Sequence, residues 1–496
     1  MEIDTSRSLE AAAGVNRLDT KERPSLGSID GPIHFVGIGG IGMSALARLL
    51  LADGSAVSGS DKAASEITEE LSSLGAQVFV GHQAENVGKA KAIVLSTAIN
   101  KENPELAAAL EKELPVYHRS EVLAYLASKK KLLAISGTHG KTTTTGMLAE
   151  VLLDSGKDPS VVVGGIFARM KSNAHAGKGE HFVAEADESD RTHASMVSDI
   201  AVVTNIEPDH MENYPGGLEQ ILQTMASFAN NANRCVVLCS DDPGCLKLMP
   251  LLQKRIVTYG EMPYSLPNKG EQSPDYRLKL VDDTTFSVTH HGTELGNVTL
   301  SVPGKHNKLN ALATLVVALE CGVAFKDAAD ALSKFRGVAR RFDLVGSAHD
   351  ILVIDDYGHH PTEVRATLEA AQQFRTREKP NGRIVIVFQP HQPGRLRDLW
   401  DDFVEAFKES DLLLLTDIYV ARGGNIEGIS SEKFSKVVKH HQVHYLPGAS
   451  NELAPKIKAH LKPGDIVLTV GAGDITNVGR ALLKLLQDEG VNGRNV

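Results

Sequence analysis

The fold of the middle of the chain follows from one stretch, Leu132-Leu-Ala-Ile-Ser-Gly-Thr-His-Gly-Lys-Thr-Thr-Thr-Thr145. Its apolar start predicts a buried strand over residues 132–136, and the apolar residues beyond it predict a helix from about Lys141 to Asp154. The loop between them departs from the phosphate-binding pattern GxxxxGK[ST] only because Ile135 stands where the first glycine belongs. The stretch therefore predicts a P-loop in a parallel α/β domain.

Lys141 and Thr142 are the residues expected to act on a polyphosphate. A lysine in the first turn of a helix opposes the helix dipole, and a bound polyphosphate would reverse that penalty. We expect Lys141 to reach the β- and γ-phosphates and the hydroxyl of Thr142 to bind Mg²⁺. The alternative is a helix entry without a ligand, although threonines are poor helix formers and four of them begin this helix.

Four carboxylates follow the next predicted strand, residues 181–184, and these are Glu185, Asp187, Glu188 and Asp190. Ligands gather at the carboxyl ends of strands in open α/β sheets. Crowded carboxylates repel one another, and a divalent cation is a physical reason to tolerate them. An acidic surface loop is the alternative.

His210 follows a further apolar strand, residues 200–203. Taken alone, such a histidine is a surface or capping residue. Beside a P-loop and Glu185 on neighbouring strands, it becomes a candidate for a second metal ligand.

A second glycine-rich motif, Gly37-Ile-Gly-Gly-Ile-Gly42, lies between a predicted strand (33–37) and a predicted helix (41–52). This satisfies GxGxxG in its strand–turn–helix context, where the helix N-terminus binds a diphosphate. Asp61 lies about 20 residues further on, where an acidic side chain commonly hydrogen-bonds a ribose or a base. The pattern alone suggests NAD, but these residues do not specify the nucleotide.

Length and composition limit the class of protein. At about 100–200 residues per domain, the 496 residues indicate about three domains. The 52 basic and 62 acidic residues give a net charge of −10, which repels a nucleic-acid backbone. Four cysteines indicate no disulfide framework. We find no signal peptide and no membrane-spanning stretch, so we expect no membrane partner and a cytoplasmic location.

Alternating strand and helix patterns predict an α/β protein of three domains. We expect a Rossmann-like N-terminal domain, a central P-loop ATPase-type domain with antiparallel strands added over residues 275–302, and a Rossmann-like C-terminal domain. The predicted boundaries are 1–31 for a mobile extension, then 32–129, 130–338 and 339–496.

Four strings together resemble the Mur ligase family, and they are Gly137-Thr-His-Gly-Lys-Thr-Thr-Thr-Thr145, Glu185-Ala-Asp-Glu-Ser-Asp190, Thr204-Asn-Ile-Glu-Pro-Asp-His-Met211 and Pro303-Gly-Lys-His-Asn-Lys-Leu-Asn310. The resemblance extends over about residues 32 to 480. Two further strings resemble the branch that joins L-alanine to UDP-N-acetylmuramate, namely His34-Phe-Val-Gly-Ile-Gly-Gly-Ile-Gly-Met-Ser44 and Asp355-Asp-Tyr-Gly-His-His-Pro-Thr-Glu363. The segment between His210 and Arg234 has no lysine, whereas other branches carry a carbamylated lysine there.

The resemblance implies an ATP- and Mg²⁺-dependent ligase of peptidoglycan synthesis that works through an acyl phosphate. Its N-terminal domain would bind UDP-N-acetylmuramate, its central domain ATP, and its C-terminal domain L-alanine. The implied ATP-binding residues are Gly137, Thr138, His139, Gly140, Lys141, Thr142, Thr143, Asn307, Asn310 and Asp356. The implied metal ligands are Thr142, Glu185 and His210.

The remaining site residues also follow from the resemblance. For the UDP-sugar they are Gly39, Gly40, Ile41, Gly42, Asp61 and Arg341. For the amino acid they are Tyr357, His359 and Arg395. The catalytic set is Lys141, Glu185, His210 and His359, and either His359 or His360 would accept the amine proton.

Three alternatives stay open at this stage. A sibling ligase would attach another amino acid or a recycled peptide to the same nucleotide sugar. A regulatory ATPase would use the P-loop without joining anything. An NAD-dependent oxidoreductase would rest only on GxGxxG and Asp61. A monomer and a homodimer are both compatible with the sequence.

Overall fold

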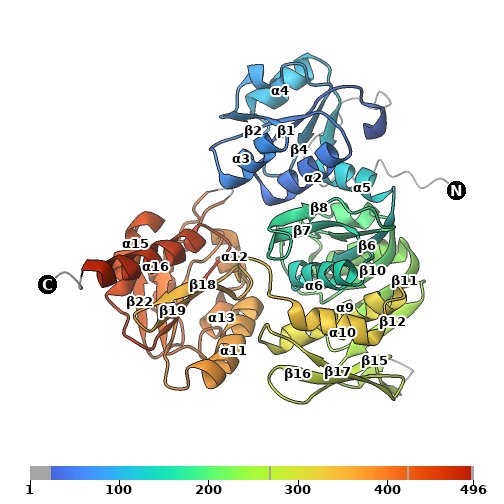
Figure 1. The fold of residues 1–496 in the computed structure, drawn as a ribbon. Coiled ribbons are helices and arrows are strands. Elements are labelled where there is room, and N and C mark those ends of the chain that lie inside the picture. The colour runs from blue at the N-terminus through green and yellow to red at the C-terminus, as the bar shows by residue number, and fades with distance from the viewer. Residues whose placement is uncertain (1–23, 267–269, 422–423, 493–496) are drawn as a thin grey trace. The chain divides into compact units, whose positions relative to one another are not determined.

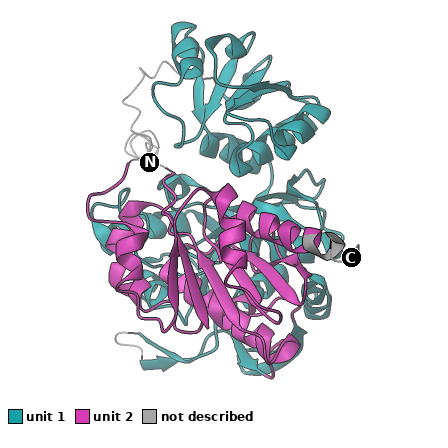
Figure 2. Cartoon of the chain, turned by 90° about the vertical axis from the view of Figure 1, so that its left-hand side faces the viewer, with its two compact units in different colours: residues 1–280, 286–299, 309–335 teal, residues 281–285, 300–308, 336–496 magenta. Residues whose placement is uncertain are grey.

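The computed structural model describes residues 24–266, 270–421 and 424–492 and divides the chain into two compact units (Figure 2). Unit 1 comprises residues 1–280, 286–299 and 309–335, and unit 2 comprises the rest. Most of the predicted N-terminal extension, residues 1–23, lies outside the described residues. In its described part, Leu26 is buried in the short 3-10 helix η1 (Leu26–Ser28), and the carbonyl of Pro24 accepts a hydrogen bond from the Tyr117 hydroxyl.

The first sheet of unit 1 is five-stranded and parallel throughout, with the order β3-β2-β1-β4-β5 (Figure 1). Its strands are β1 (Ile33–Val36), β2 (Val57–Asp61), β3 (Gln77–Val80), β4 (Ala92–Leu95) and β5 (Val116–His118). Its helices are α2 (Ile41–Ala52), α3 (Glu66–Ser73), η2 (Ala84–Val87), α4 (Pro104–Glu111) and α5 (Arg119–Ala127). The strand order reverses between β1 and β4, so the loop after β1 lies at the switch point where such sheets bind ligands.

The second sheet of unit 1 has ten strands in the order β17-β16-β15-β12-β11-β10-β6-β9-β7-β8. Its strands are β6 (Lys131–Ser136), β7 (Ser160–Phe167), β8 (Ser172–His175), β9 (His181–Glu185), β10 (Ser198–Val203), β11 (Ala232–Cys239), β12 (Ile256–Gly260), β15 (Tyr276–Leu280), β16 (Thr285–His290) and β17 (Thr293–Thr299). The pair β15 and β16 is antiparallel, as the sequence predicts. Two short antiparallel strands, β13 (Tyr264–Leu266) and β14 (Gly270–Gln272), form a separate sheet.

The parallel neighbours of β6 are β9 and β10, and this adjacency organises the domain. Ile135 pairs with Glu185 on one side, and Ser136 pairs with Val203 on the other. The three strands therefore end together, and their following loops share one edge of the sheet. The helices of this domain are α6 (Lys141–Asp154), η3 (Thr192–Ser195), α7 (Gly217–Asn230), α8 (Pro243–Leu248), η4 (Met249–Leu251), α9 (Lys305–Glu320) and α10 (Phe325–Lys334).

Unit 2 contains a six-stranded sheet in the order β18-β19-β23-β20-β21-β22, in which only the edge strand β18 runs antiparallel. Its strands are β18 (Asp343–Ala348), β19 (Ile351–Asp356), β20 (Ile384–Phe388), β21 (Leu412–Thr416), β22 (Val443–Leu446) and β23 (Ile466–Val470). Its helices are α11 (Pro361–Glu378), α12 (Pro393–Asp398), α13 (Trp400–Val404), α14 (Ser431–Ser435), α15 (Ser450–Lys458) and α16 (Ile475–Asn492). The three α/β sheets agree with the predicted fold class.

Glu105, at the start of α4, is a fully buried carboxylate in the N-terminal domain. It accepts hydrogen bonds from Ser60 Oγ at 2.5 Å and from Asn86 Nδ2 at 2.7 Å, and His34 Nε2 lies 3.7 Å away. Burial alone would raise the pKa of Glu105, but these partners overcome burial and lower the pKa to about 2. The ionised carboxylate therefore ties β1, β2 and α4 together.

Glu105→Gln should lower the free energy of unfolding by on the order of 2–3 kcal/mol at pH 7. The pKa of Glu105 is about 2 in the folded protein and about 4.5 in the unfolded chain, so the ionised carboxylate stabilises the fold at pH values above the unfolded-state pKa. The difference from the wild type should shrink as the pH falls from about 4.5 toward 2. Thermal unfolding across this pH range measures it, and Glu111→Gln, an exposed position on the same helix, is the matched control. A loss that does not change with pH would contradict the role of the ionised carboxylate.

Candidate functional site

The loop between β6 and α6 is closely surrounded by backbone and side chains. Gly137 has φ +129° and Gly140 has φ +84°, conformations that L side chains rarely adopt. A Cβ at Gly137 would collide with Thr204, and one at Gly140 would lie 2.6 Å from Oδ1 of Asn310 on α9. The loop therefore needs both glycines to take this backbone course.

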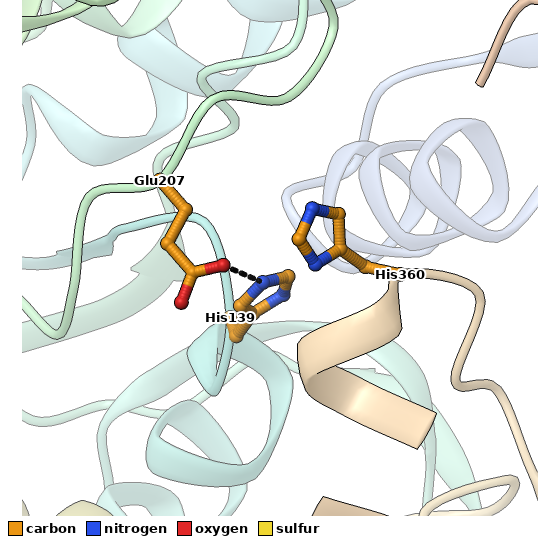
Figure 3. A group of neighbouring side chains, drawn as sticks. All are labelled: His139, Glu207 and His360. Carbon is orange, nitrogen blue, oxygen red and sulfur yellow. Dashed lines mark ion pairs between the residues drawn. The ribbon is translucent and has the colours of Figure 1, made fainter. Parts of the chain in front are cut away.

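Thr204 and Asn205, which follow β10, hold the middle of this loop. The backbone N–H of His139 donates to Oδ1 of Asn205 at 2.8 Å, and its carbonyl accepts from Nδ2 of Asn205 at 3.0 Å and from Oγ1 of Thr204 at 2.6 Å. The His139 ring forms an ion pair with Glu207, with Nε2 and Oε2 3.6 Å apart (Figure 3). The loop after β10 thus fixes the conformation of the P-loop.

Lys141 bends back over the P-loop from the first turn of α6. Its Nζ donates to the carbonyls of Gly137 at 2.6 Å and Thr138 at 3.1 Å, and it lies 2.8 Å from Oε2 of Glu188. Burial alone would lower the pKa of Lys141, but Glu188 and Asp187 overcome burial and raise it. Lys141 is therefore a cation held at the place where the sequence predicts a polyphosphate.

Glu185 and Thr142 bring two oxygen donors together beside the P-loop. Thr142 Oγ1 donates to Glu185 Oε2 at 3.2 Å, and Glu185 Oε1 accepts from the backbone N–H of Gly164 at 2.5 Å. A hydroxyl and a carboxylate are ligands that Mg²⁺ prefers. Two of the three predicted metal ligands are thus adjacent.

His210 lies in the loop after β10 with a left-handed backbone, φ +53°. Its N–H donates to Oδ1 of Asp209 at 2.8 Å, and its Nε2 lies 3.5 Å from Oδ2 of the same residue. Burial raises the pKa of Glu188, whereas the charges of Lys141 and His210 oppose that rise. His210 therefore acts electrostatically on the acidic segment, and its metal ligation stays a prediction.

The other carboxylates of the acidic segment pair with protein cations. Glu188 pairs with Lys141, while Asp187 accepts a hydrogen bond from Arg119 Nη2 at 2.8 Å, and Asp190 lies 3.7 Å from the same nitrogen. We expected a divalent cation to relieve the crowding of all four carboxylates. Arg119 and Lys141 lie beside Asp187, Glu188 and Asp190, while Oε2 of Glu185 accepts a hydrogen bond from Thr142.

The glycine motif after β1 also receives an internal carboxylate. The N–H of Gly39 donates to Oδ2 of Asp61 at 2.9 Å, and a Cβ on Gly39 would meet the same oxygen at 2.9 Å. Gly40 caps α2, which begins at Ile41. Asp61, predicted to bind a ribose, orients the loop in this structure, and its contact with a nucleotide stays a prediction.

Within unit 2, the predicted amino-acid residues form one cluster. The Tyr357 and His359 rings meet edge to face with centroids 5.3 Å apart, and His391 meets His359 in the same way at 5.7 Å. Arg395 Nη1 lies 3.1 Å from Nδ1 of His391, and Tyr419 stacks on His391 at 5.8 Å. The loops after β19, β20 and β21 supply the ring side chains, and helix α12 supplies Arg395.

The other predicted residues of unit 2 have clear local roles. Arg341 lies over the Tyr357 ring at 5.0 Å. Asp356 is buried and accepts hydrogen bonds from the N–H groups of Phe342 and Gly358, both at 2.8 Å. Burial raises the pKa of Asp356, and Arg341 partly offsets the rise. His360, also drawn in Figure 3, caps α11.

Asn307 and Asn310 both lie on α9, three residues apart and hence on one face. Nδ2 of Asn307 donates to the Pro303 carbonyl at 2.6 Å, while Asn310 abuts Gly140 of the P-loop. The structure thus places Asn310 beside the P-loop, and its contact with ATP stays a prediction.

Sequence reasoning missed three residues of these clusters, namely Arg119, Asn205 and His391. Asn205 lies inside one of the strings quoted in the sequence analysis, directly after a predicted strand, and that position was a usable signal. His391 follows β20, and its ring partners come from the loops after β19 and β21. Arg119 follows a three-residue strand with no motif around it, so the sequence offered no comparable signal.

Comparisons with known proteins agree with this architecture. Residues 32–131 match the model of the Mur ligase family catalytic domain, residues 135–318 the Mur ligase middle domain, and residues 340–473 the Mur ligase glutamate ligase domain. The chain is 44% identical to the UDP-N-acetylmuramate--L-alanine ligases of Geotalea uraniireducens and Geobacter sulfurreducens, over 92% of this chain and 98% of each relative. The chain belongs to the Mur ligase family.

Two solved structures have a fold similar to that of this chain. The UDP-N-acetylmuramate-alanine ligase of Thermotoga maritima is 30% identical, with a TM-score of 0.78 over 93% of this chain and 100% of that one. A murein peptide ligase of Psychrobacter arcticus shares the fold at 23% identity, with a TM-score of 0.70 over 92% of this chain and 99% of that one. No helix within the described residues is both long and apolar enough to cross a membrane.

Proposed function

We propose that the protein joins L-alanine to the lactyl carboxylate of UDP-N-acetylmuramate with consumption of ATP. The products are UDP-N-acetylmuramoyl-L-alanine, ADP and phosphate, and the reaction belongs to peptidoglycan synthesis. The 44% identity to ligases of this name over 98% of their length carries the proposal. A cytoplasmic location suits an enzyme that consumes ATP.

The proposed chemistry needs a P-loop but requires no nucleophilic side chain. A carboxylate is a poor electrophile, so its oxygen first attacks the γ-phosphorus of ATP and ADP leaves. The neutral amine of L-alanine then attacks the carbonyl of the acyl phosphate, and phosphate leaves. Positioning and charge stabilisation are sufficient for both steps.

In this proposal, Lys141 stabilises the charge on the transferring phosphoryl group. It is partly buried, cationic and held over the P-loop carbonyls, so it needs little reorganisation before the reaction. Residues 137–143 bind the phosphates through their backbone, and Asn310 lies beside them on the adenosine side.

Mg²⁺ is compatible with the donors beside the P-loop. Thr142 Oγ1 and Glu185 Oε2 are 3.2 Å apart, and His210 is the third proposed ligand. The ion would neutralise charge on the β- and γ-phosphates.

The cluster of unit 2 is the proposed site for L-alanine. Arg395 can bind its carboxylate in bidentate fashion, and His359 can accept the proton of its amine near neutral pH. Nδ1 of His359 lies 3.0 Å from the Tyr357 carbonyl and 3.2 Å from Oε2 of Glu363, and these contacts orient the ring. Tyr357 and Arg341 complete this side of the site.

We expect product formation and ADP release with UDP-N-acetylmuramate to be fastest with L-alanine, compared with glycine, L-serine and a tripeptide. Mass spectrometry of the nucleotide product measures the joining directly. A preference for the tripeptide would instead identify a peptide-adding sibling ligase. ATP hydrolysis that is unaffected by every one of these substrates would identify a regulatory ATPase.

Lys141→Ala should abolish product formation, with a loss of at least about 10³-fold in kcat, while the affinity for UDP-N-acetylmuramate stays nearly unchanged. Because the change leaves Glu188 buried without its cation, thermal unfolding must be measured alongside activity. Lys131→Ala, an exposed lysine at the start of β6, is the matched control. Normal turnover by a folded Lys141→Ala protein would contradict the phosphate role.

His210→Ala should raise the Mg²⁺ concentration needed for half-maximal activity by about tenfold or more, because one proposed ligand is lost. A magnesium titration at saturating ATP measures this shift. His175→Ala, at the end of the edge strand β8, is the control. An unchanged titration would remove His210 from the metal site.

A further inference from the structure

Arg119 links the two α/β domains of unit 1. It is the first residue of α5 in the N-terminal domain, and its Nη2 donates to Oδ2 of Asp187 in the central domain at 2.8 Å. The same nitrogen lies 3.7 Å from Oδ2 of the buried Asp190. A cation at the start of a helix opposes the helix dipole, and these carboxylates compensate for that cost.

The other side of the guanidinium faces the glycine motif. A Cβ on Gly42 would lie 3.3 Å from Nη1 of Arg119, so this nitrogen lies against the first turn of α2. Gly42 therefore leaves room for Arg119 beside the first turn of α2. The Arg119 side chain keeps about a quarter of its surface exposed, so it is accessible to a bound molecule.

The charges around Arg119 explain why a cation is needed at this place. Oδ2 of Asp187 and Oδ2 of Asp190 lie 2.8 Å and 3.7 Å from Nη2 of Arg119. Asp187 and Asp190 thus present negative charge toward the glycine motif. These two carboxylates would repel a diphosphate bound at the glycine motif unless Arg119 lay between the carboxylates and the diphosphate.

We propose that Arg119 is a further substrate-binding residue that binds the diphosphate of the sugar nucleotide through Nη1 while Asp187 holds Nη2. The proposal rests on the proposed function, because that function places a UDP-sugar at the glycine motif. A planar guanidinium donates in several directions at once, which suits a bridge between two anions. Asp187 is then a positioning residue, since it acts through Arg119.

Isothermal titration of UDP, UDP-N-acetylglucosamine and UDP-N-acetylmuramate, without ATP, tests this directly. Arg119→Gln should weaken all three by about 10- to 100-fold, because all three carry the diphosphate and lose a charge-assisted hydrogen bond. A loss confined to UDP-N-acetylmuramate would assign Arg119 to the lactyl carboxylate and overturn the proposal. Unchanged affinity for all three would also overturn it.

A second variant separates charge from structure. In the Arg119→Gln background, Asp187→Asn removes a charge that now repels the diphosphate, so UDP affinity should recover by about threefold or more. A purely structural bridge is already broken by the first change and would show no recovery. Failure to recover would overturn the electrostatic part of the proposal.

Arg48 provides the matched control, because it also links the same two domains. It lies on α2 and donates to Asn173 Oδ1 at 2.5 Å and to Glu70 Oε2 at 2.7 Å. Arg48→Gln should change UDP affinity by less than about twofold, even if it lowers thermal stability. A loss as large as that of Arg119→Gln would show that the domain contact matters rather than Arg119.

These binding measurements do not depend on turnover. If the wild-type protein binds UDP but forms no UDP-N-acetylmuramoyl-L-alanine, the proposed function fails while the assignment of Arg119 is still tested.

Discussion

The placement of β6 between β9 and β10 is the constraint on which the site depends. The register of these parallel strands brings the P-loop, the acidic segment and the Thr204–Asn205 loop to one edge of the sheet. Each loop then stabilises another, because Asn205 holds His139, Thr142 binds Glu185 and Lys141 pairs with Glu188. A change in register on either side of β6 would separate these contacts.

Charge balance is the second feature that shapes this edge of the sheet. Asp187, Glu188 and Asp190 follow β9 within a few residues, and they are tolerated because Arg119 and Lys141 lie among them. Each of these cations is paired with a carboxylate and also lies beside a glycine-rich loop. The acidic segment therefore positions two cations for two phosphate-containing substrates, according to our proposals.

Much of this arrangement could be predicted from the sequence. Strong strand–loop–helix patterns located β1, α2, β6 and α6 within one or two residues, because apolar runs and glycines determine such units locally. The helix α4 and the strand β5 were missed. The strand β5 has only three residues, which is too short to show an alternation of apolar and polar side chains. The contact of Arg119 with Asp187 joins residues 68 positions apart, and such a pairing depends on how two domains pack. The same limit applies to His391 and Tyr419, whose stacking depends on the order of strands in the unit 2 sheet.

In the proposed reaction, the lactyl carboxylate attacks the terminal phosphate of ATP bound at the P-loop. This step can be followed with UDP-N-acetylmuramate labelled with ¹⁸O in that carboxylate, incubated with the protein, ATP and L-alanine. The released phosphate should carry one ¹⁸O atom for each amide bond formed. Phosphate free of ¹⁸O, in a reaction that still forms the amide, would contradict this step.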